Sequence, residues 1–293
     1  LAGTAVRAIL SSIFGSYSDK REALAALTES QSYNYAGESE LWLDYISDTG
    51  DGFDSTFSMA KLISEKDITV EQNGEPSFLK RGKLVVFGGD QVYPTPSKEE
   101  YFNRFIGPVE AASLQASPDI KTDLFAIPGN HDWYDGLTNF VKIFCHEKEI
   151  GGFRTIQNRS YFAIKVTENT WVWATDVQLQ SDIDDEQINY FEWVAQKEMV
   201  KGDNVILFTA EPAWVYNSLR HEDLSYHHLE EFERDVIKAN GMKQVLTVAG
   251  DLHHYARYSR HEEDGNVRHK ITAGGGGAFL HPTKNLPTTL THM

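Results

Sequence analysis

The chain has 293 residues and a formal net charge of −16 at neutral pH. A balance this acidic disfavours a nucleic-acid backbone as the main partner, because phosphate binding requires clustered Lys and Arg. The single cysteine, Cys145, rules out an internal disulfide framework, so we expect a reducing, cytoplasmic location. No run approaches the roughly 20 apolar residues of a membrane span. The apolar stretch from Ala5 to Phe14 nevertheless leaves open an upstream targeting or membrane segment.

Residues 1–39 are expected to form a helical N-terminal extension and a linker. Arg21 to Leu27 is rich in Ala and Leu and predicts a short helix, whereas Thr28 to Gly37 is polar. In residues 40–293, strand-like runs alternate with helical stretches. This alternation favours a single α/β catalytic domain.

Five apolar, strand-like runs each end in a metal-ligand residue or in a polar pair at the matching place. They are Leu41–Ser47 before Asp48, Leu84–Gly89 before Asp90, Leu124–Gly129 before Asn130-His131-Asp132, Val205–Thr209 before Ala210-Glu211, and Val245–Gly250 before Asp251-Leu252-His253. In open α/β sheets, ligands gather beyond the carboxyl ends of the strands. The repeated arrangement therefore predicts a metal site at one sheet edge.

Three segments between these strands have the apolar spacing of helices. They are Lys98–Ser113, Asp185–Val200 with Asp184 as its N-cap, and Leu224–Ala239. The runs Tyr161–Val166 and Trp171–Asp176 predict a hairpin, and Lys270–Ala273 predicts a strand that leads into Gly274–Gly277. A glycine run of this kind lets the backbone approach a ligand closely or adopt positive φ.

The chemistry of a two-metal site suggests a role for each polar strand end. Two cations held roughly 3.5 to 4 Å apart need a carboxylate that bridges them, and they can then hold a hydroxide for in-line attack on phosphorus. Asp90 is the natural bridge. Asp48 and a neutral His253 would complete the first metal site. Asn130 and Asp251 would complete the second.

The ordered set of motifs resembles the calcineurin-like metallophosphoesterase superfamily. The matching stretches are Asp48-Thr49-Gly50, Gly89-Asp90-Gln91-Val92-Tyr93, Gly129-Asn130-His131-Asp132 and Gly250-Asp251-Leu252-His253. The resemblance extends from Glu40 to Pro282. It implies two packed mixed β-sheets flanked by helices, in a four-layer sandwich, and phosphoester hydrolysis at a dinuclear metal centre with a metal-bound hydroxide.

Two features are similar to the purple acid phosphatases within this superfamily: the Asp-x-Gly form at Asp48 and Tyr93 three residues after Asp90. The resemblance implies that Tyr93 is a ligand of the first metal, where a phenolate favours a ferric ion. We therefore expect Fe or Mn at the first site. Packing under the loop before Pro94 is an open alternative for Tyr93.

The chain departs from the superfamily at Ala210-Glu211 and at Asp251, where relatives supply histidines. Oxygen ligands in place of imidazoles favour Mn²⁺ or Mg²⁺ over Zn²⁺ at the second site. Glu211 either recovers the missing ligand or, close to Pro212, points elsewhere.

In related enzymes, the histidine at the position of His131 faces the scissile phosphate. The resemblance implies that His131 stabilises the transition state or protonates the leaving group, and Asp132 could orient it by a hydrogen bond. Glu211, His254 and His281 are candidate substrate-binding residues. Loop or packing roles are equally open for both histidines.

The favoured function is hydrolysis of a small phosphoester, either a monoester or a diester, by a protein whose oligomeric state is left open. A metal-binding or phosphate-sensing module of the same fold, weakened by the missing histidine at position 210, is the second interpretation. A nuclease is the third, through a local basic groove formed by Arg257, Arg260, Arg268 and Lys270.

Overall fold

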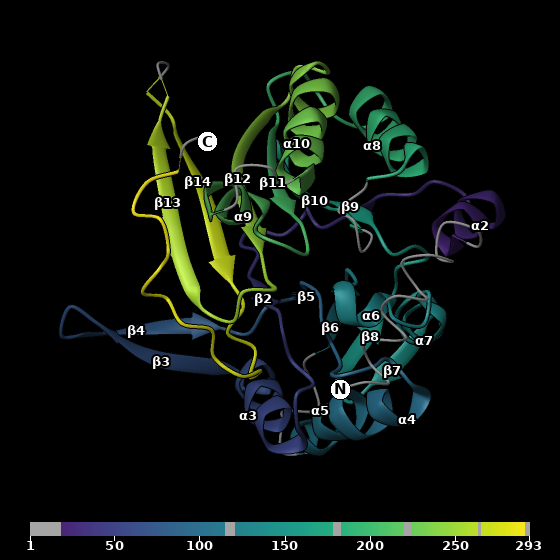
Figure 1. Ribbon diagram of the computed structural model, residues 1–293, viewed down its shortest axis with the longest axis vertical. Coiled ribbons are helices and arrows are strands. Elements are labelled where there is room, and N and C mark those ends of the chain that lie inside the picture. Colours follow the sequence, from purple (N-terminus) through teal and green to yellow (C-terminus); the bar gives the residue numbers. More distant parts are fainter. Residues whose placement is uncertain (1–18, 115–120, 178–182, 220–223, 263–264, 291–293) are drawn as a thin grey trace.

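The computed structural model describes residues 19–114, 121–177, 183–219, 224–262 and 265–290. In these ranges, two mixed β-sheets pack face to face, and helices cover the outer side of each sheet (Figure 1). The predicted α/β class and four-layer arrangement are thereby confirmed. No helix in the described part is both long enough and apolar enough to cross a membrane. The predicted apolar stretch from Ala5 to Phe14 lies outside the described residues.

The larger sheet has seven strands in the described part, in the order β1-β9-β10-β11-β12-β14-β13. Their bounds are Tyr33–Asn34 (β1), Phe162–Thr167 (β9), Thr170–Ala174 (β10), Asn204–Phe208 (β11), Lys243–Ala249 (β12), Tyr255–His261 (β13) and Val267–Ala273 (β14). Strands β10, β11, β12 and β14 are parallel, and β9 and β13 pair antiparallel with β10 and β14. The carboxyl ends of β11 and β12 therefore meet at one edge.

The smaller sheet has five strands within the same ranges, in the order β2-β5-β6-β8-β7. Their bounds are Leu43–Ile46 (β2), Leu84–Phe87 (β5), Thr122–Ala126 (β6), Lys148–Ile150 (β7) and Phe153–Thr155 (β8). Strands β2, β5 and β6 are parallel, so their carboxyl ends also share an edge. A separate hairpin is formed by β3 (Asp67–Gln72) and β4 (Glu75–Lys80), which projects beside β13 in Figure 1.

The core between the sheets accounts for the inner apolar face of the strands, and the helical layers cover the outer face. Leu84 and Val86 of β5 and Phe125 of β6 are buried against Phe162 of β9 and Val172 of β10. The rings of Phe125 and Phe162 lie 4.9 Å apart between centroids. Burying each such side chain contributes about 1.5–3 kcal/mol, which holds the strand ends at fixed positions.

The outer layers contain the three predicted helical segments and further helices that were not predicted. Against the larger sheet pack α8 (Asp185–Lys197), α9 (Ala213–Leu219), α10 (Leu224–Glu231) and the π-helical η3 (Phe232–Lys238). Against the smaller sheet pack α3 (Phe53–Ser64), α4 (Lys98–Tyr101), the π-helical η2 (Phe102–Ile106), α5 (Gly107–Ser113), α6 (Asn130–Trp133) and α7 (Thr138–Phe144). Asp184 caps α8 as predicted, because its carboxylate accepts a hydrogen bond from the N–H of Gln187 (3.0 Å).

The described part of the N-terminal extension is integrated into the fold. Helix α2 (Lys20–Leu27) is the predicted helix, and Asp19 caps it through a 2.9 Å hydrogen bond from the N–H of Arg21. The segment predicted as a polar linker contributes β1, which pairs parallel with β9. The division of the chain at residue 39 stays a prediction, and residues 1–18 lie outside the described part.

Candidate metal centre

Three carboxylates come together where the edges of the two sheets meet. Asp48 follows β2, Asp90 follows β5 and Asp251 follows β12. Their backbone φ angles are 62°, 52° and 64°, in the left-handed region. Holding a residue other than glycine in this region costs of the order of 1–3 kcal/mol, and such residues gather at functional sites. The chain thus turns in the same way after all three strands.

The burial of these carboxylates raises the pKa of each one. Asp48 and Asp90 are 0% and 3% exposed, and Asp251 is half-buried. Burial is the main cause, and the charge of Asp90 raises the pKa of Asp48 and Asp251 further. Within the described residues, no Lys or Arg forms an ion pair with any of the three. Clustered buried carboxylates without a counter-charge are costly, so a bound cation would stabilise their ionised form.

Tyr93 joins Asp48, Asp90 and His253 through its hydroxyl group. The hydroxyl lies 3.0 Å from Oδ2 of Asp90, 3.2 Å from Oδ1 of Asp48 and 3.0 Å from Nε2 of His253. Burial and the two nearby carboxylates raise the pKa of Tyr93, so the side chain is a phenol in this structure. One proton can serve only one acceptor at a time, which leaves lone pairs of the other two directed at the same point.

His253 presents an unprotonated nitrogen to this point. Its Nδ1 is hydrogen-bonded to the carbonyl oxygen of Phe279, which can only accept, so Nδ1 carries the proton. Burial lowers the pKa of His253, which favours the neutral ring. Nε2 lies 3.6 Å from Oδ1 of Asp48, and the ring of His281 stacks on that of His253 at 4.3 Å. A neutral imidazole whose tautomer is fixed in this way is the form that binds metals.

Asn130 supplies an oxygen that lacks a partner. Its Nδ2 donates to the hydroxyl of Tyr134 (3.1 Å), whereas the buried Oδ1 has no hydrogen-bond partner among the described residues. A buried acceptor left in this state costs about 1–3 kcal/mol. The same residue lines a cavity of about 30 Å³, enough for one or two particles the size of water. The lining residues are Asp48, Gly89, Asp90, Gly129, Asn130, Val177, Ala210, Glu211 and Asp251.

These donors fit divalent cations in type, although they are not yet arranged around one. In the described ranges, no group of three or more His, Cys, Asp and Glu side chains is already close enough to hold a metal ion. The hydroxyl groups of Tyr93 and Tyr216 are hydrogen-bonded to the carboxylates instead. Carboxylate and amide oxygens with one imidazole nevertheless suit Mn²⁺, Mg²⁺ and Fe. The partnerless oxygen of Asn130 and the small cavity beside it support this fit.

His131 lies at the rim of the centre. Its backbone N–H donates to Oδ1 of Asp90 (2.9 Å), and its Nδ1 is 3.0 Å from the carbonyl oxygen of Pro94. A carbonyl can only accept, so Nδ1 carries a proton there and Nε2 is the atom that can gain or lose one. The ring also packs at 4.3 Å on that of Tyr93.

Asp132 does not form the predicted hydrogen bond to His131. Its buried carboxylate accepts from the hydroxyl of Tyr101 and from the N–H groups of Gly129 (2.9 Å) and Gln91 (3.4 Å). None of its hydrogen bonds in the described part goes to His131, whose ring is held by Pro94 instead. Asp132 is the third residue of the short helix α6. Its carboxylate is therefore placed to accept hydrogen bonds at the start of that helix and not to contact the ring of His131.

Comparison with known proteins identifies the family of this chain. The calcineurin-like phosphoesterase model matches residues 42–263, a range that includes all three carboxylates. This chain belongs to the calcineurin-like phosphoesterase family. Comparison with curated proteins gave no match. Among the solved structures that match is one titled "Structure of PhoD", with 11% identity and a TM-score of 0.47. The match covers 79% of this chain and 56% of that one, so the chain spans little more than half its length.

In this calcineurin-like chain, the residues that stand where the resemblance implied histidines, Ala210-Glu211 and Asp251, line the cavity. Ala210 is buried, and Glu211 lines the cavity beside it. His254 is buried as well. Neither of its ring nitrogens has a hydrogen-bond partner in the described part, and burial lowers its pKa. His281 is partly exposed and stacks on His253, as described above.

The glycine run after β14 closes against the Asp48 turn. The N–H of Gly276 donates to the carbonyl of Ser47 (2.8 Å). A Cβ atom added to Gly274 would lie 2.7 Å from Oδ2 of Asp48 and 2.4 Å from the carbonyl of Leu252. The backbone therefore lies close to the Asp48 carboxylate here, and Gly277 has the predicted positive φ (114°), whereas the close approach to a ligand stays a prediction.

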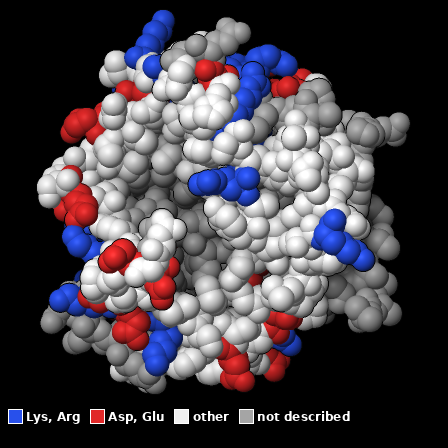
Figure 2. Space-filling view, turned by 90° about the vertical axis from the view of Figure 1, so that its left-hand side faces the viewer, with Lys and Arg blue, Asp and Glu red and all other residues white. Residues whose placement is uncertain are grey.

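Two of the four residues of the basic groove in the nuclease interpretation are buried, whereas Arg257 and Arg260 are exposed on β13. Lys270 and Arg268 are 0% and 7% exposed, and both face Glu233, at 3.1 Å and 3.7 Å. They are therefore buried in ion pairs and cannot contact a nucleic acid. On the face shown in Figure 2, which is the side of β13 in Figure 1, Lys and Arg are scattered among Asp and Glu.

Proposed function

We propose that this calcineurin-like chain is a metal-dependent hydrolase of small phosphoesters. One observation carries the proposal: Asn130, whose buried Oδ1 has no hydrogen-bond partner among the described residues, lines a small cavity together with Asp48, Asp90 and Asp251. Such a convergence of buried oxygens is costly without a cation and suited to one. Family membership suggests that phosphoester hydrolysis is the reaction served.

The proposed ligands form two overlapping sets that share Asp90. The first set is Asp48, Asp90, Tyr93 and His253, for Fe or Mn, and the second is Asp90, Asn130 and Asp251, for Mn or Mg. When bound, such ions polarise a phosphoryl oxygen and supply a nucleophile at neutral pH. Within the first set, His253 is ready to bind through Nε2 because Phe279 holds the proton on Nδ1.

His131 is the residue that would donate a proton to the leaving group. The carbonyl of Pro94 fixes the ring by accepting from Nδ1, so Nε2 is the atom that would donate to a departing oxygen. The protonated ring would also stabilise negative charge that develops on the phosphoryl group. His254 and His281 are proposed to lie along the substrate path and Glu211 on the side of the second metal.

A metal-reloading experiment tests the function. We expect protein stripped of metal to be inactive on an aryl phosphate and to regain turnover with Mn²⁺, Fe or Mg²⁺. Absence of turnover with all three would favour the second interpretation, a metal-binding or phosphate-sensing module without catalysis. Faster cleavage of single-stranded DNA than of small monoesters and diesters would favour a nuclease instead.

A further inference from the structure

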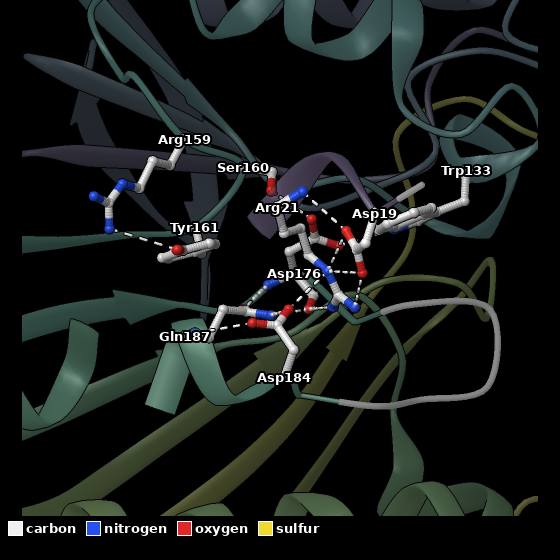
Figure 3. Close-up of polar contacts among 9 residues, drawn as sticks. All are labelled: Asp19, Arg21, Trp133, Arg159, Ser160, Tyr161, Asp176, Asp184 and Gln187. Carbon is white, nitrogen blue, oxygen red and sulfur yellow. Dashed lines mark hydrogen bonds and ion pairs between the residues drawn. The ribbon is translucent and has the colours of Figure 1, made fainter. Parts of the chain in front are cut away.

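A buried network of charged groups lies next to helix α6, outside the candidate metal centre. It joins α2, the end of β10 and the start of α8 to helix α6, which carries Asn130 and His131 (Figure 3). Figure 3 shows Arg21 at its centre, with Asp19, Asp176 and Asp184 around the guanidinium group. The proposed reaction uses none of these residues directly.

Arg21 is held by carboxylates although it is almost completely buried. Its side chain is 1% exposed, and its guanidinium group lies 2.7 Å from Oδ2 of Asp19 and 2.7 Å from Oδ2 of Asp184. It also donates to the backbone carbonyl of Asp176 (3.3 Å). Burial alone would favour the uncharged form, but the carboxylates of Asp176, Asp19 and Asp184 raise the pKa of Arg21. The residue is therefore a fixed positive charge inside the protein.

Asp176 carries the network from Arg21 to Trp133. Its carboxylate is fully buried and accepts from Nε1 of Trp133 (2.9 Å) and from Oγ of Ser160 (2.5 Å). Gln187 holds the backbone of Asp176 through two 2.8 Å hydrogen bonds. The guanidinium of Arg21 lies 5.1 Å from the centre of the Trp133 ring, so this cation contacts both Asp176 and Trp133.

Trp133 links this network to the metal centre because it is the last residue of α6. Asn130, the first residue of that helix, offers the partnerless oxygen, and the N–H of His131 bonds to Asp90. Next to Arg21, Lys20 donates to the carbonyl of Gly136 (2.9 Å), in the loop that follows α6. Helix α2 thus contacts both α6 and the loop that follows it.

We propose that Arg21 is a positioning residue for the metal centre, acting through Asp176 and Trp133 to fix the turn that carries Asn130 and His131. The measurement of kcat that tests this inference rests on the proposed function, whereas the measurement of hydrogen exchange does not. Without Arg21, the buried Asp176 carboxylate loses its counter-charge and Trp133 loses the cation on its ring. The start of helix α6 then samples positions in which Asn130 and His131 are displaced. Displacements of about 1 Å are enough to lower turnover by up to about 10²-fold.

The chain offers a matched control in Arg159. This arginine is 4% exposed and also holds the N-terminal segment, because it donates to the carbonyl and hydroxyl oxygens of Thr28 at 2.7 and 2.9 Å. Its guanidinium lies over the rings of Tyr161 and Tyr190, away from α6 (Figure 3). Arg159→Gln therefore removes a buried arginine of the same kind without touching Trp133.

The experiment compares wild type, Arg21→Gln and Arg159→Gln, each loaded with Mn²⁺, on an aryl phosphate. We expect kcat to fall by about 10- to 10²-fold in Arg21→Gln, with KM within about twofold, and Arg159→Gln to keep wild-type kcat although its Tm also falls. Arg21→Lys, which keeps the charge, should recover part of the loss. Equal losses of kcat in the two glutamine variants would overturn the proposal and leave Arg21 a purely structural residue.

Two further measurements keep the test decisive. If Arg21→Gln does not fold, Trp133→Phe removes the bond to Asp176 together with part of the buried ring, and unchanged kcat in that variant would overturn the proposal. Amide hydrogen exchange of residues 129–133 needs no turnover: we expect faster exchange in Arg21→Gln than in Arg159→Gln. An inactive wild type would refute the proposed function alone, whereas equal exchange in both variants would refute the positioning role.

Discussion

The Asp90 carboxylate serves two neighbours at once, since Oδ1 accepts from the N–H of His131 and Oδ2 from the hydroxyl of Tyr93. An amide in its place keeps one oxygen acceptor but cannot bridge two cations. We expect Asp90→Asn to abolish turnover and to lower metal content at both sites. The fold should survive, because burial raises the pKa of Asp90 and a neutral amide avoids that cost. Elemental analysis and a melting curve check both parts, and full turnover with normal metal content would contradict the bridging role.

His131 is expected to act on the substrate rather than on the metals. Its Nδ1 faces the carbonyl of Pro94, and only Nε2 is placed to transfer a proton. His131→Ala should lower kcat by roughly 10²- to 10⁴-fold and leave bound metal almost unchanged. The loss should be smaller for substrates with good leaving groups, which need less protonation. A loss of metal in this variant would instead make His131 a ligand.

Tyr93 decides whether the centre resembles that of the purple acid phosphatases. Its hydroxyl lies within 3.2 Å of Asp48, Asp90 and His253, so a cation among them would meet the phenol oxygen. A phenolate bound to ferric iron absorbs visible light. We expect oxidised, iron-loaded protein to be coloured and Tyr93→Phe to bleach it without unfolding. Colourless protein that contains ferric iron would exclude Tyr93 as a ligand and leave the hydrolase proposal intact.

Residue identities at strand ends were enough to assemble much of the candidate site. The structure brings Asp48, Asp90, Asn130, Asp251 and His253 together, as their positions after apolar runs predicted, although their ligation of metals stays a prediction. The partners that fix their orientation were missed. The carbonyls of Pro94 and Phe279, which set the tautomers of His131 and His253, are backbone groups, and any residue type could supply them.

At the scale of elements, apolar runs predicted the buried parallel strands well and edge strands poorly. Every residue of β5 is buried, so its sequence is apolar on both faces. In contrast, β13 lies at the edge of its sheet and exposes most of its residues, so Tyr255 to His261 lacks the apolar face that would have marked it as a strand. Pairing with β14 along its whole length forms this strand instead.

The glycine run after β14 offers a test at this scale. A Cβ atom on Gly274 would lie 2.4 Å from the carbonyl of Leu252 and 2.7 Å from Oδ2 of Asp48. The backbone must shift to admit it, so we expect Gly274→Ala to lower the free energy of unfolding by about 1–3 kcal/mol and to weaken metal binding at the Asp48 site. Denaturant unfolding and a metal titration measure the two effects.

Gly275 is the matched control for this substitution. It is the next residue in the chain, and a Cβ atom there would meet nothing within 4 Å. Gly275→Ala should therefore leave both unfolding and metal affinity close to wild type. If the two variants behaved alike, the close approach of Gly274 to Asp48 would have no energetic consequence.

At the scale of the whole molecule, the contacts that join distant segments had no counterpart in the sequence. Arg21 and Asp176 are separated by 155 positions, yet they share one buried network with Trp133. The sequence showed only a short helix rich in Ala and Leu at Arg21 and predicted a linker after it. Neither pattern indicates which carboxylate the arginine meets, because that depends on how α2 packs across the edge of the two sheets.

The same network predicts how Asp176 affects stability as pH changes. Burial raises the pKa of Asp176 to about 7, despite the nearby charge of Arg21, whereas in the unfolded chain the pKa is about 4. Between these values the folded protein holds a proton that the unfolded chain has released. The contribution of Asp176 to stability is therefore fully present below about pH 4 and is lost as pH rises towards 7, by up to about 1.4 kcal/mol per pH unit. Asp176→Asn cannot titrate, so we expect the free energy of unfolding of wild type, relative to this variant, to fall steadily across that window. Urea unfolding of both proteins at several pH values measures the difference, and a difference that stayed constant with pH would show that Asp176 is already ionised in the folded protein throughout the window.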